Sequence, residues 1–213
     1  MSPLSFVHRF EPATAPNRPP LLLLHGTGGD EADLLPLGRA VSPGSALLSP
    51  RGKVLENGQP RFFRRLAEGV FDEADVIARA GELAAFVAEA RDVYGIGAPV
   101  ALGFSNGANM AAAVLLLHPG ALAGAALLRA MTPLRKLPSA DLLGRPVLIL
   151  SGAMDPIVPA ENAAHLAAGL RAVGAAVEHR MLPTGHGLSQ ADVGLVQDWL
   201  TFPPSGAAGL PNL

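Results

Sequence analysis

The stretch of residues 99–110 places the strongest constraint on how this chain can fold. Residues 100–102 form a short apolar run, typical of a buried strand, which stops at Gly103, and the Ala- and Leu-rich pattern of a helix begins after Gly107. A sharp turn from strand to helix therefore falls on Ser105. The glycines two residues before and after this serine let neighbouring backbone approach closely and make strained dihedral angles less costly.

Short apolar runs and amphipathic stretches alternate along the rest of the chain. Four consecutive leucines, residues 21–24, are typical of a strand buried on both faces. Residues 72–94 carry apolar side chains at spacings of three and four, which predicts a helix that ends at Gly95. Further strands are expected at residues 5–10, 46–49, 123–128, 146–150 and 177–182, and further helices at 33–41, 107–118, 159–173 and 189–199. The pattern predicts an α/β fold, a mostly parallel sheet of six or seven strands with helices on both faces.

Four chemically distinctive features directly follow predicted strands. They are the glycine-rich loop at residues 25–30, Ser105, Asp155 and His186. Because the carboxyl ends of parallel strands meet at one edge of a sheet, where ligands bind, we expect these features to lie together. The loop exposes backbone N–H groups that can hold an anion, and the alternative is an ordinary turn.

Serine, aspartate and histidine together can activate a nucleophile. A serine hydroxyl reacts poorly unless an imidazole takes its proton, and the imidazole needs a carboxylate on its other nitrogen. The chain order Ser105, Asp155, His186 is the order found in α/β-hydrolases, and residues 103–107 fit the nucleophile-elbow pattern G-x-S-x-G. The alternative is a packing turn with an inert serine.

Four ordered motifs resemble the phospholipase/carboxylesterase branch of the α/β-hydrolase superfamily. They lie at residues 24–30, 103–107, 152–159 and 185–186, and the resemblance covers about residues 20–200. This branch includes small bacterial carboxylesterases and acyl-protein thioesterases. A second match, residues 51–58 with 61–64, resembles bacterial esterases linked to hydroquinone or quinone stress.

The resemblance implies a role for each motif residue. Ser105 would be the nucleophile, Asp155 the orienting acid and His186 the base. The backbone N–H groups of Thr27 and Asn106 would form the oxyanion hole. It implies no cofactor and a small-molecule ester as the partner, and a homodimer stays open.

Other histidines and carboxylates fit these roles less well. His25 is expected to hold the glycine-rich loop through hydrogen bonds, and Asp30 to bond N–H groups of the same loop, because a negative charge there would oppose an oxyanion. Asp192 is assigned to helix capping and Asp198 to a solvated helix face. The remaining histidines, His8, His118, His165 and His179, lie in or at the end of predicted strands and helices. No His/Asp/Glu set has the spacing of metal ligands, so no metal site is expected.

The pocket is expected to be open, because residues 129–145 are too few for a folded cap domain. The residues expected near the catalytic loops, as an apolar lining, are Phe62, Phe63, Met131, Leu134, Met154, Ile157 and Leu188.

The segment at residues 51–71 allows two interpretations, and residues 51–65 show no periodicity. In one, its arginines make surface ion pairs with acids such as Glu56 while its phenylalanines anchor it to the core. In the other, Phe62 or Phe63 closes the pocket and an arginine favours substrates with a nearby negative charge.

Composition limits the remaining choices. With 213 residues the chain suits one domain, expected at residues 1–202, followed by a loosely attached tail at 203–213. A net charge of −2 and no long apolar run argue against nucleic-acid or membrane partners, and the absence of cysteine excludes disulfides. Without a signal-peptide pattern, a cytoplasmic location is expected.

Two classes of function follow. The first is a serine carboxylesterase that cleaves small carboxylic esters or thioesters, with a lysophospholipase or acyl-protein thioesterase as alternative. A peptidase is not excluded, and the missing cap and missing membrane-binding segment count against a long-chain lipase. The second is a non-catalytic ligand-binding protein on the same fold.

Overall fold

The computed structural model describes residues 4–201, and a seven-stranded sheet forms its centre. The strand order is β1-β3-β2-β8-β9-β10-β11, and every neighbouring pair is parallel except β1 with β3. The strands are β1 His8–Glu11, β2 Leu21–Leu24, β3 Leu47–Pro50, β8 Val100–Phe104, β9 Gly124–Leu128, β10 Pro146–Gly152 and β11 Ala176–Leu182. The predicted α/β-hydrolase fold, with a mostly parallel sheet, is confirmed.

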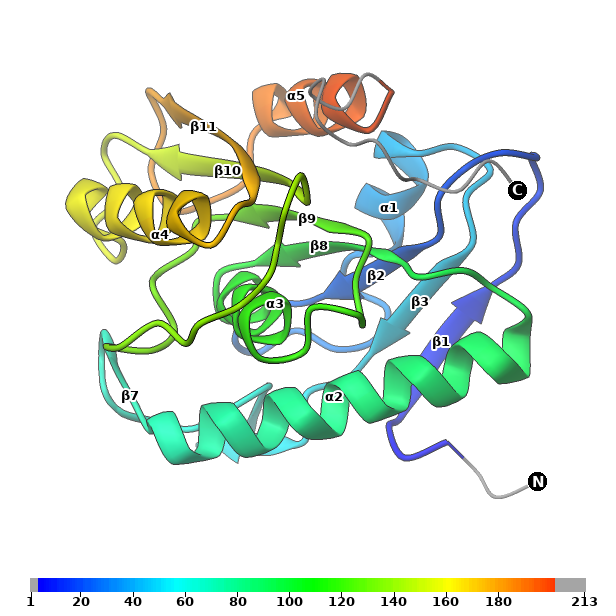
Figure 1. Ribbon diagram of the computed structural model, residues 1–213, viewed down its shortest axis with the longest axis horizontal. Helices are drawn as coiled ribbons and strands as arrows, with labels where there is room; N and C mark the ends of the chain where they lie inside the picture. Colours follow the sequence, from blue (N-terminus) through cyan, green and yellow to red (C-terminus); the bar gives the residue numbers. More distant parts are fainter. Residues whose placement is uncertain (1–3, 202–213) are drawn as a thin grey trace.

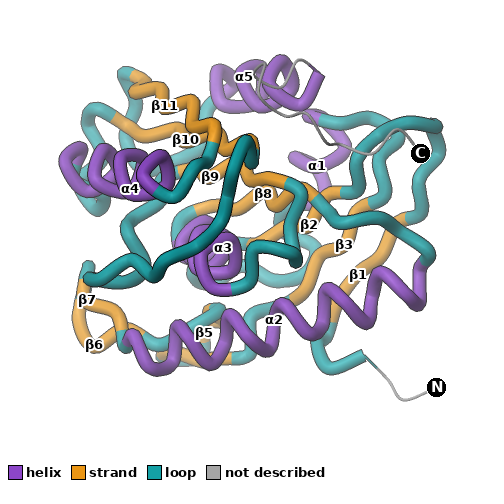
Figure 2. Tube along the Cα trace, viewed as in Figure 1, coloured by secondary structure: helices purple, strands orange, loops and turns teal. Residues whose placement is uncertain are grey.

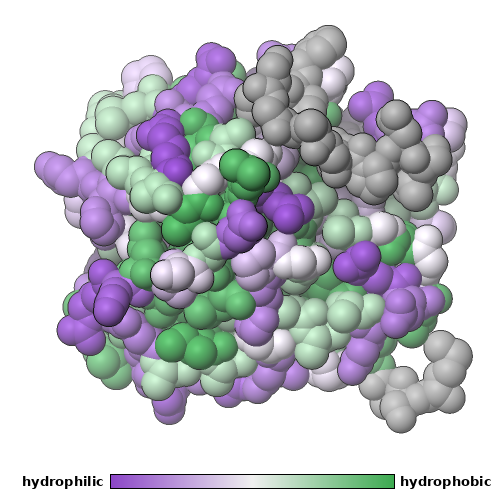
Figure 3. Space-filling model, viewed as in Figure 1, coloured by the Kyte–Doolittle hydropathy of each residue, from purple (hydrophilic) through white to green (hydrophobic). Residues whose placement is uncertain are grey.

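Five helices are described, and they cover both faces of the sheet (Figure 1). They are α1 Leu35–Val41, α2 Glu73–Tyr94, α3 Asn106–Leu117, α4 Ala160–Ala172 and α5 Gln190–Thr201. Helices α2, α3 and α4 pack on one face and α1 and α5 on the other, so the sheet lies between two helical layers (Figure 2). In the space-filling view, polar and apolar side chains are interspersed over the visible face, as expected where helices meet water (Figure 3).

The leucines of β2 connect the two layers of the core. All four are buried, and because side chains alternate along a strand, they point to opposite faces. Leu22 and Leu24 pack in the cluster that contains α2, α3 and α4, whereas Leu21 and Leu23 pack in the cluster that contains α1 and α5. Burial of each leucine contributes about 1.5–3 kcal/mol to folding, which fixes β2 at the centre of the sheet.

Helix α2 has the start and end that its sequence predicts. The Asp72 side chain accepts a hydrogen bond from the N–H of Asp75 at 3.2 Å, which caps the first turn. Gly95 ends the helix with a φ of 63°, in the left-handed region that glycine adopts without strain. The helix runs back across the sheet and is followed by strand β8.

The segment at residues 51–71 is more regular than its sequence indicated. It forms two short hairpins, β4 Val54–Glu56 with β5 Gln59–Arg61, and β6 Arg65–Ala67 with β7 Val70–Phe71. The first turns at Asn57 and Gly58, which have φ angles of 52° and 80°. Asn-Gly is the preferred pair for such a turn, so this dipeptide is a local sign of a hairpin. It was overlooked because the residues around it show no periodicity.

The connections relevant to the site are short. Residues 129–145, between β9 and β10, contain no helix or strand, in agreement with the predicted lack of a cap domain. The tail expected at residues 203–213 lies outside the described residues. Within residues 4–201, none of the helices has the length and apolar character needed to cross a bilayer.

Candidate active site

Ser105 occupies the sharp turn between β8 and α3. Its φ of 52° and ψ of −115° are unusual for a residue with a side chain. The two flanking glycines make this turn possible. A Cβ on Gly107 would lie 2.0 Å from the carbonyl oxygen of Leu24, and one on Gly103 would lie 2.7 Å from Cα of Ala108. The serine hydroxyl is thereby presented at the carboxyl edge of the sheet.

The structure brings Ser105, His186 and Asp155 into one hydrogen-bonded chain. The His186 Nε2 atom lies 3.0 Å from Ser105 Oγ, and His186 Nδ1 lies 2.8 Å from Asp155 Oδ2. Asp155 follows β10 and His186 follows β11, so three different strand ends supply the three residues. Their chain positions span 81 residues between Ser105 and His186, which only the parallel sheet brings together.

The environment of Asp155 favours its charged form. Burial alone would raise the pKa of this carboxyl, but hydrogen bonds from the N–H groups of Val158 and Ile157 and from His186 lower the pKa overall. The two backbone bonds to Oδ1 measure 3.0 and 2.8 Å. A buried, ionised carboxylate on Nδ1 directs the other imidazole nitrogen toward the serine as a proton acceptor.

The glycine-rich loop after β2 supplies free backbone donors beside Ser105. Within residues 4–201, the N–H groups of Thr27 and of Asn106, the first residue of α3, donate to no acceptor. Asp30 bonds the loop itself, accepting from the N–H of Ala32 at 2.8 Å, which agrees with the structural role predicted for it. The loop is therefore equipped to stabilise a developing negative charge.

His25 holds this loop, as predicted. Its Nδ1 lies 2.7 Å from the carbonyl oxygen of Gly26, and its Nε2 accepts from the N–H of Gly52 at 3.0 Å. Burial lowers the pKa of His25, so the neutral ring has the donor and the acceptor that these two bonds require. The ring connects the loop to the start of the hairpin segment.

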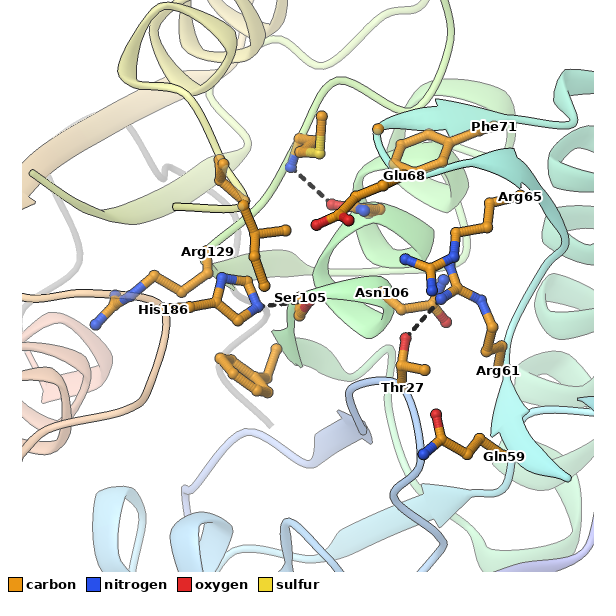
Figure 4. A pocket seen from close by; sticks show the side chains of 16 residues that line it. Thr27, Gln59, Arg61, Arg65, Glu68, Phe71, Ser105, Asn106, Arg129 and His186 are labelled. Carbon is orange, nitrogen blue, oxygen red and sulfur yellow. Dashed lines mark hydrogen bonds between the residues drawn. The ribbon is translucent and has the colours of Figure 1, made fainter. Parts of the chain in front are cut away.

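The cleft above Ser105 has a volume of about 310 Å³. Thr27, Asn106, His186, Met131 and Ile157 line it, among the residues expected at the site (Figure 4). The cleft is also lined by Gln59, Glu68, Phe71, Asn109 and Arg129, which were not among the expected lining residues. Arg61 and Arg65 line it as well, and they belong to the segment for which an arginine at the pocket was one of the two interpretations.

Five of the expected lining residues lie elsewhere. Phe62 and Phe63 are 3% and 0% exposed and belong to the core, as does Leu134. Met154 and Leu188 are exposed and lie outside the cleft lining.

The position of the phenylalanines follows from packing. The Phe62 N–H donates to Asn106 Oδ1 at 2.7 Å, while its ring packs on His25 with centroids 4.7 Å apart. The Phe63 ring packs edge-on against Phe71 at 5.0 Å, and it is Phe71 that faces the cleft. The anchoring interpretation of residues 51–71 therefore describes Phe62 and Phe63.

Arg129, directly after β9, is a buried residue that sequence reasoning missed. Its guanidinium pairs with both carboxylate oxygens of Asp192 in α5, at 2.8 and 2.9 Å. It also donates to the carbonyl oxygens of Gly185 and Gly187, on either side of His186, at 3.0 and 3.1 Å. Arg129 thus fixes the loop that carries the histidine.

Asp192 combines two roles. It accepts from the N–H and the hydroxyl of Ser189 at 2.8 and 2.7 Å, which is the predicted cap of the last helix. It is also the partner of Arg129, and both side chains are almost completely buried. A charged residue immediately after a buried strand, Arg129 after β9, is the sequence feature from which this second role could have been inferred.

Two arginines of the hairpin segment meet at one carboxylate. The Nε atoms of Arg61 and Arg65 lie 3.1 and 2.8 Å from the two oxygens of Glu56. Arg61 is buried, and its Nη1 donates to Thr27 Oγ1 at 2.7 Å. In the part of the chain that the structure describes, no group of three His, Asp or Glu residues has the arrangement of a metal site.

Comparison with known proteins agrees with this geometry. The family model for phospholipase/carboxylesterase matches residues 8–202. The hydrolase MhqD of Bacillus subtilis (strain 168) is 44% identical over 194 residues, 90% of this chain and 96% of that protein. The crystal structure of the Bacillus cereus carboxylesterase is 44% identical with a TM-score of 0.90, over 92% of this chain and 94% of that one.

The carboxylesterase from Mesorhizobium loti is 36% identical with a TM-score of 0.90, and the match covers 95% of this chain and 98% of that chain. Sequence and structure thus match over nearly the whole length. The chain belongs to the phospholipase/carboxylesterase family of α/β-hydrolases.

Proposed function

We propose that this protein is a serine carboxylesterase that hydrolyses small carboxylic esters through an acyl-enzyme intermediate. The observation that carries the proposal is the chain of hydrogen bonds from Ser105 through His186 to Asp155, at 3.0 and 2.8 Å. The hydrolase and carboxylesterase relatives support the same reaction class.

The geometry supports the following sequence of steps. His186 Nε2 accepts the proton of Ser105 Oγ as this oxygen attacks the ester carbonyl carbon, and Asp155 stabilises the imidazolium. The tetrahedral intermediate collapses when His186 returns the proton to the leaving alkoxide, which departs as the alcohol. Water then repeats the same proton transfers on the acyl-enzyme, releases the carboxylic acid and regenerates the Ser105 hydroxyl.

The backbone N–H groups of Thr27 and Asn106 are the proposed oxyanion hole. Both are unpaired among the described residues and flank the serine, one from the glycine-rich loop and one from the start of α3. Two fixed donors in such a site contribute strongly because they stabilise the charge that develops in the transition state.

The size of the cleft supports small substrates. A volume of about 310 Å³ suits short or aromatic acyl groups better than a long lipid chain, and residues 129–145 contain no helix or strand that would cap the cleft. Thioesters would use the same nucleophile, base and oxyanion donors, so a thioester activity is compatible with this mechanism.

Covalent labelling tests the proposal. A fluorophosphonate should add to Ser105 in a 1:1 ratio and abolish ester hydrolysis, because only an activated serine displaces fluoride from phosphorus. Mass spectrometry of the digested protein identifies the labelled residue. The Ser105→Ala variant should not be labelled, and its kcat should fall by about 10⁴–10⁶.

Ser151 provides a matched control. Its Oγ lies 2.8 Å from His179 Nε2, so it is also a serine paired with a histidine, but it is buried in β10 and away from the cleft. The Ser151→Ala variant should be labelled like the unchanged protein. The serine mechanism would be refuted if Ser105→Ala were still labelled, or if its kcat stayed above about a tenth of that of the unchanged protein.

A further inference from the structure

One wall of the cleft carries hydrogen-bond donors that the proposed chemistry does not use. It is formed by the side chains of Arg61, Arg65 and Asn106, which Figure 4 shows on the side of Ser105 away from His186. We call these three residues the donor wall.

The charges on the donor wall do not cancel. Arg61 and Arg65 share one carboxylate, Glu56, at 3.1 and 2.8 Å, so two positive charges face one negative charge. Burial lowers the pKa of Arg61, Glu56 acts in the opposite direction, and Arg65 lowers it further by repulsion. An arginine stays protonated in such a setting, so the excess positive charge is most readily balanced by an anion.

Part of this donor capacity is unused. Within residues 4–201, no group accepts a hydrogen bond from the two terminal nitrogens of Arg65, because its hydrogen bond to Glu56, at 2.8 Å, comes from Nε. Glu68 also lines the cleft, but it is an exposed residue of the turn between β6 and β7, where solvent screens its charge. Arg65 can therefore turn its outer edge toward a ligand.

The amide of Asn106 gives an independent observation. Its Nδ2 atom is buried and has no hydrogen-bond partner among the described residues. Its orientation is fixed, because Oδ1 accepts from the N–H of Phe62 at 2.7 Å and so must be the oxygen. A buried donor without an acceptor is unfavourable, and here it lies in the wall of a cleft beside a reactive serine. Such a donor is suited to an acceptor that arrives with the substrate.

We propose that the donor wall binds a carboxylate on the acyl part of the substrate, so that the preferred substrates are half-esters of short dicarboxylic acids. This inference rests on the proposed esterase function, since His186 must protonate the leaving alcohol. The alcohol part therefore lies toward His186, and the acyl part extends to the opposite side of Ser105, where the donor wall stands. Hydrolysis of such an ester would yield the alcohol and the free dicarboxylate.

A pair of esters of equal shape tests the preference. Monoethyl succinate carries a carboxylate at the end of its acyl chain, and the ethyl ester of succinamic acid carries a neutral amide in the same place. Because a charge-assisted hydrogen bond is markedly stronger than a neutral one, we expect kcat/KM for the first to exceed the second by about tenfold or more at low ionic strength. In Arg65→Gln this ratio should fall to about one.

Arg64→Gln is the matched control. This variant removes a positive charge from the residue next to Arg65. Arg64 is exposed, however, and it pairs at 2.7 Å with Asp72, the residue that caps α2. The ratio should stay as in the unchanged protein, which separates a built carboxylate site from general attraction. A ratio near one before any substitution, or an equal fall in Arg64→Gln, would overturn the inference.

A binding measurement separates this inference from the proposed function. In Ser105→Ala, calorimetry should show tighter binding of succinate than of succinamate, and Arg65→Gln in that background should remove the difference. If succinate binds in this way but neither ester is hydrolysed, the esterase proposal fails and the carboxylate site stands. If both esters are hydrolysed equally and succinate binds no more tightly than succinamate, the carboxylate site fails and the esterase proposal stands.

Discussion

At the scale of single residues, the position of Ser105 depends on the absence of side chains beside it. The strained backbone at this serine brings the start of α3 so close to β2 that a Cβ on Gly107 would lie 2.0 Å from the carbonyl oxygen of Leu24. Leu24 cannot move away, because it pairs with Gly103 in the sheet. The geometry of the turn at Ser105 is thus determined by the packing of backbone on backbone.

We expect Gly107→Ala to lower the free energy of unfolding by about 3 kcal/mol, because overpacking against a fixed strand forces the backbone apart. Gly97→Ala is the control, since a Cβ there meets nothing within 4 Å and the change should stay within about 0.5 kcal/mol. Urea denaturation of both variants measures the difference. Equal stability of the two would show that the turn tolerates a side chain.

At the scale of elements, the two hairpins at residues 54–71 divide their aromatic residues between the core and the cleft. Phe63 is fully buried, whereas Phe71 contacts it edge-on and faces the cleft. The same segment supplies Arg61 and Arg65 of the donor wall. The segment therefore contributes both to the scaffold and to the lining of the cleft.

We expect Phe63→Ala to reduce the free energy of unfolding by about 3–5 kcal/mol and to affect short and bulky esters alike, because its ring does not reach the cleft. Phe71→Ala should instead lower kcat/KM more for a bulky aromatic ester than for an acetate ester, since contacts with the acyl group contribute in the transition state. Steady-state kinetics with both esters, alongside denaturation, tests the pair. The assignment is wrong if Phe63→Ala is the variant that discriminates between the esters.

At the scale of the whole molecule, the ion pair of Arg129 and Asp192 connects the end of β9, the His186 loop and α5. Burial alone would raise the pKa of Asp192, but hydrogen bonds from Arg129 and Ser189 lower it below its ordinary value of 3.8. The ionised carboxylate is therefore the form that the fold stabilises.

Breaking this pair should be costly in a way that depends on pH. Asp192→Asn leaves the Arg129 charge buried without its ionised partner. We therefore expect the free energy of unfolding to fall by about 3–5 kcal/mol near pH 7. Because the pKa of Asp192 is lowered on folding, its contribution is complete above about pH 4 and is lost as the pH falls through the lower folded value. The difference in the free energy of unfolding between the unchanged protein and Asp192→Asn should therefore be smaller in acid. Urea denaturation of both proteins at pH 7 and at pH 3 measures this difference.

Glu178→Gln serves as the control for this experiment. It removes a carboxylate from the exposed pair of Glu178 and Arg180, whose charges are screened by solvent. Its effect should stay within about 0.5 kcal/mol at pH 7. A similar, small effect of Asp192→Asn would mean that the buried pair adds little to stability.

Much of the fold followed from local patterns. The four leucines of β2, the amphipathic α2 and the glycines around Ser105 each specify an element without reference to distant residues. The order of Ser105, Asp155 and His186 along the chain, each after a predicted strand, was enough to predict that they would meet. Parallel strands make that prediction possible, because all their carboxyl ends lie at one edge.

The sequence by itself determined the alternation of elements and the residues that follow each strand, because both depend on local propensity and on side-chain periodicity. The tertiary structure alone decided which side chains of the loops and hairpins are buried and which distant residues they contact. It placed Phe62 and Phe63 in the core and paired Arg129 with Asp192 across 63 positions. It also left the Asn106 Nδ2 atom, beside two arginines, without an acceptor among the described residues. Such contacts depend on packing between distant segments, where several partners are compatible with the same local pattern.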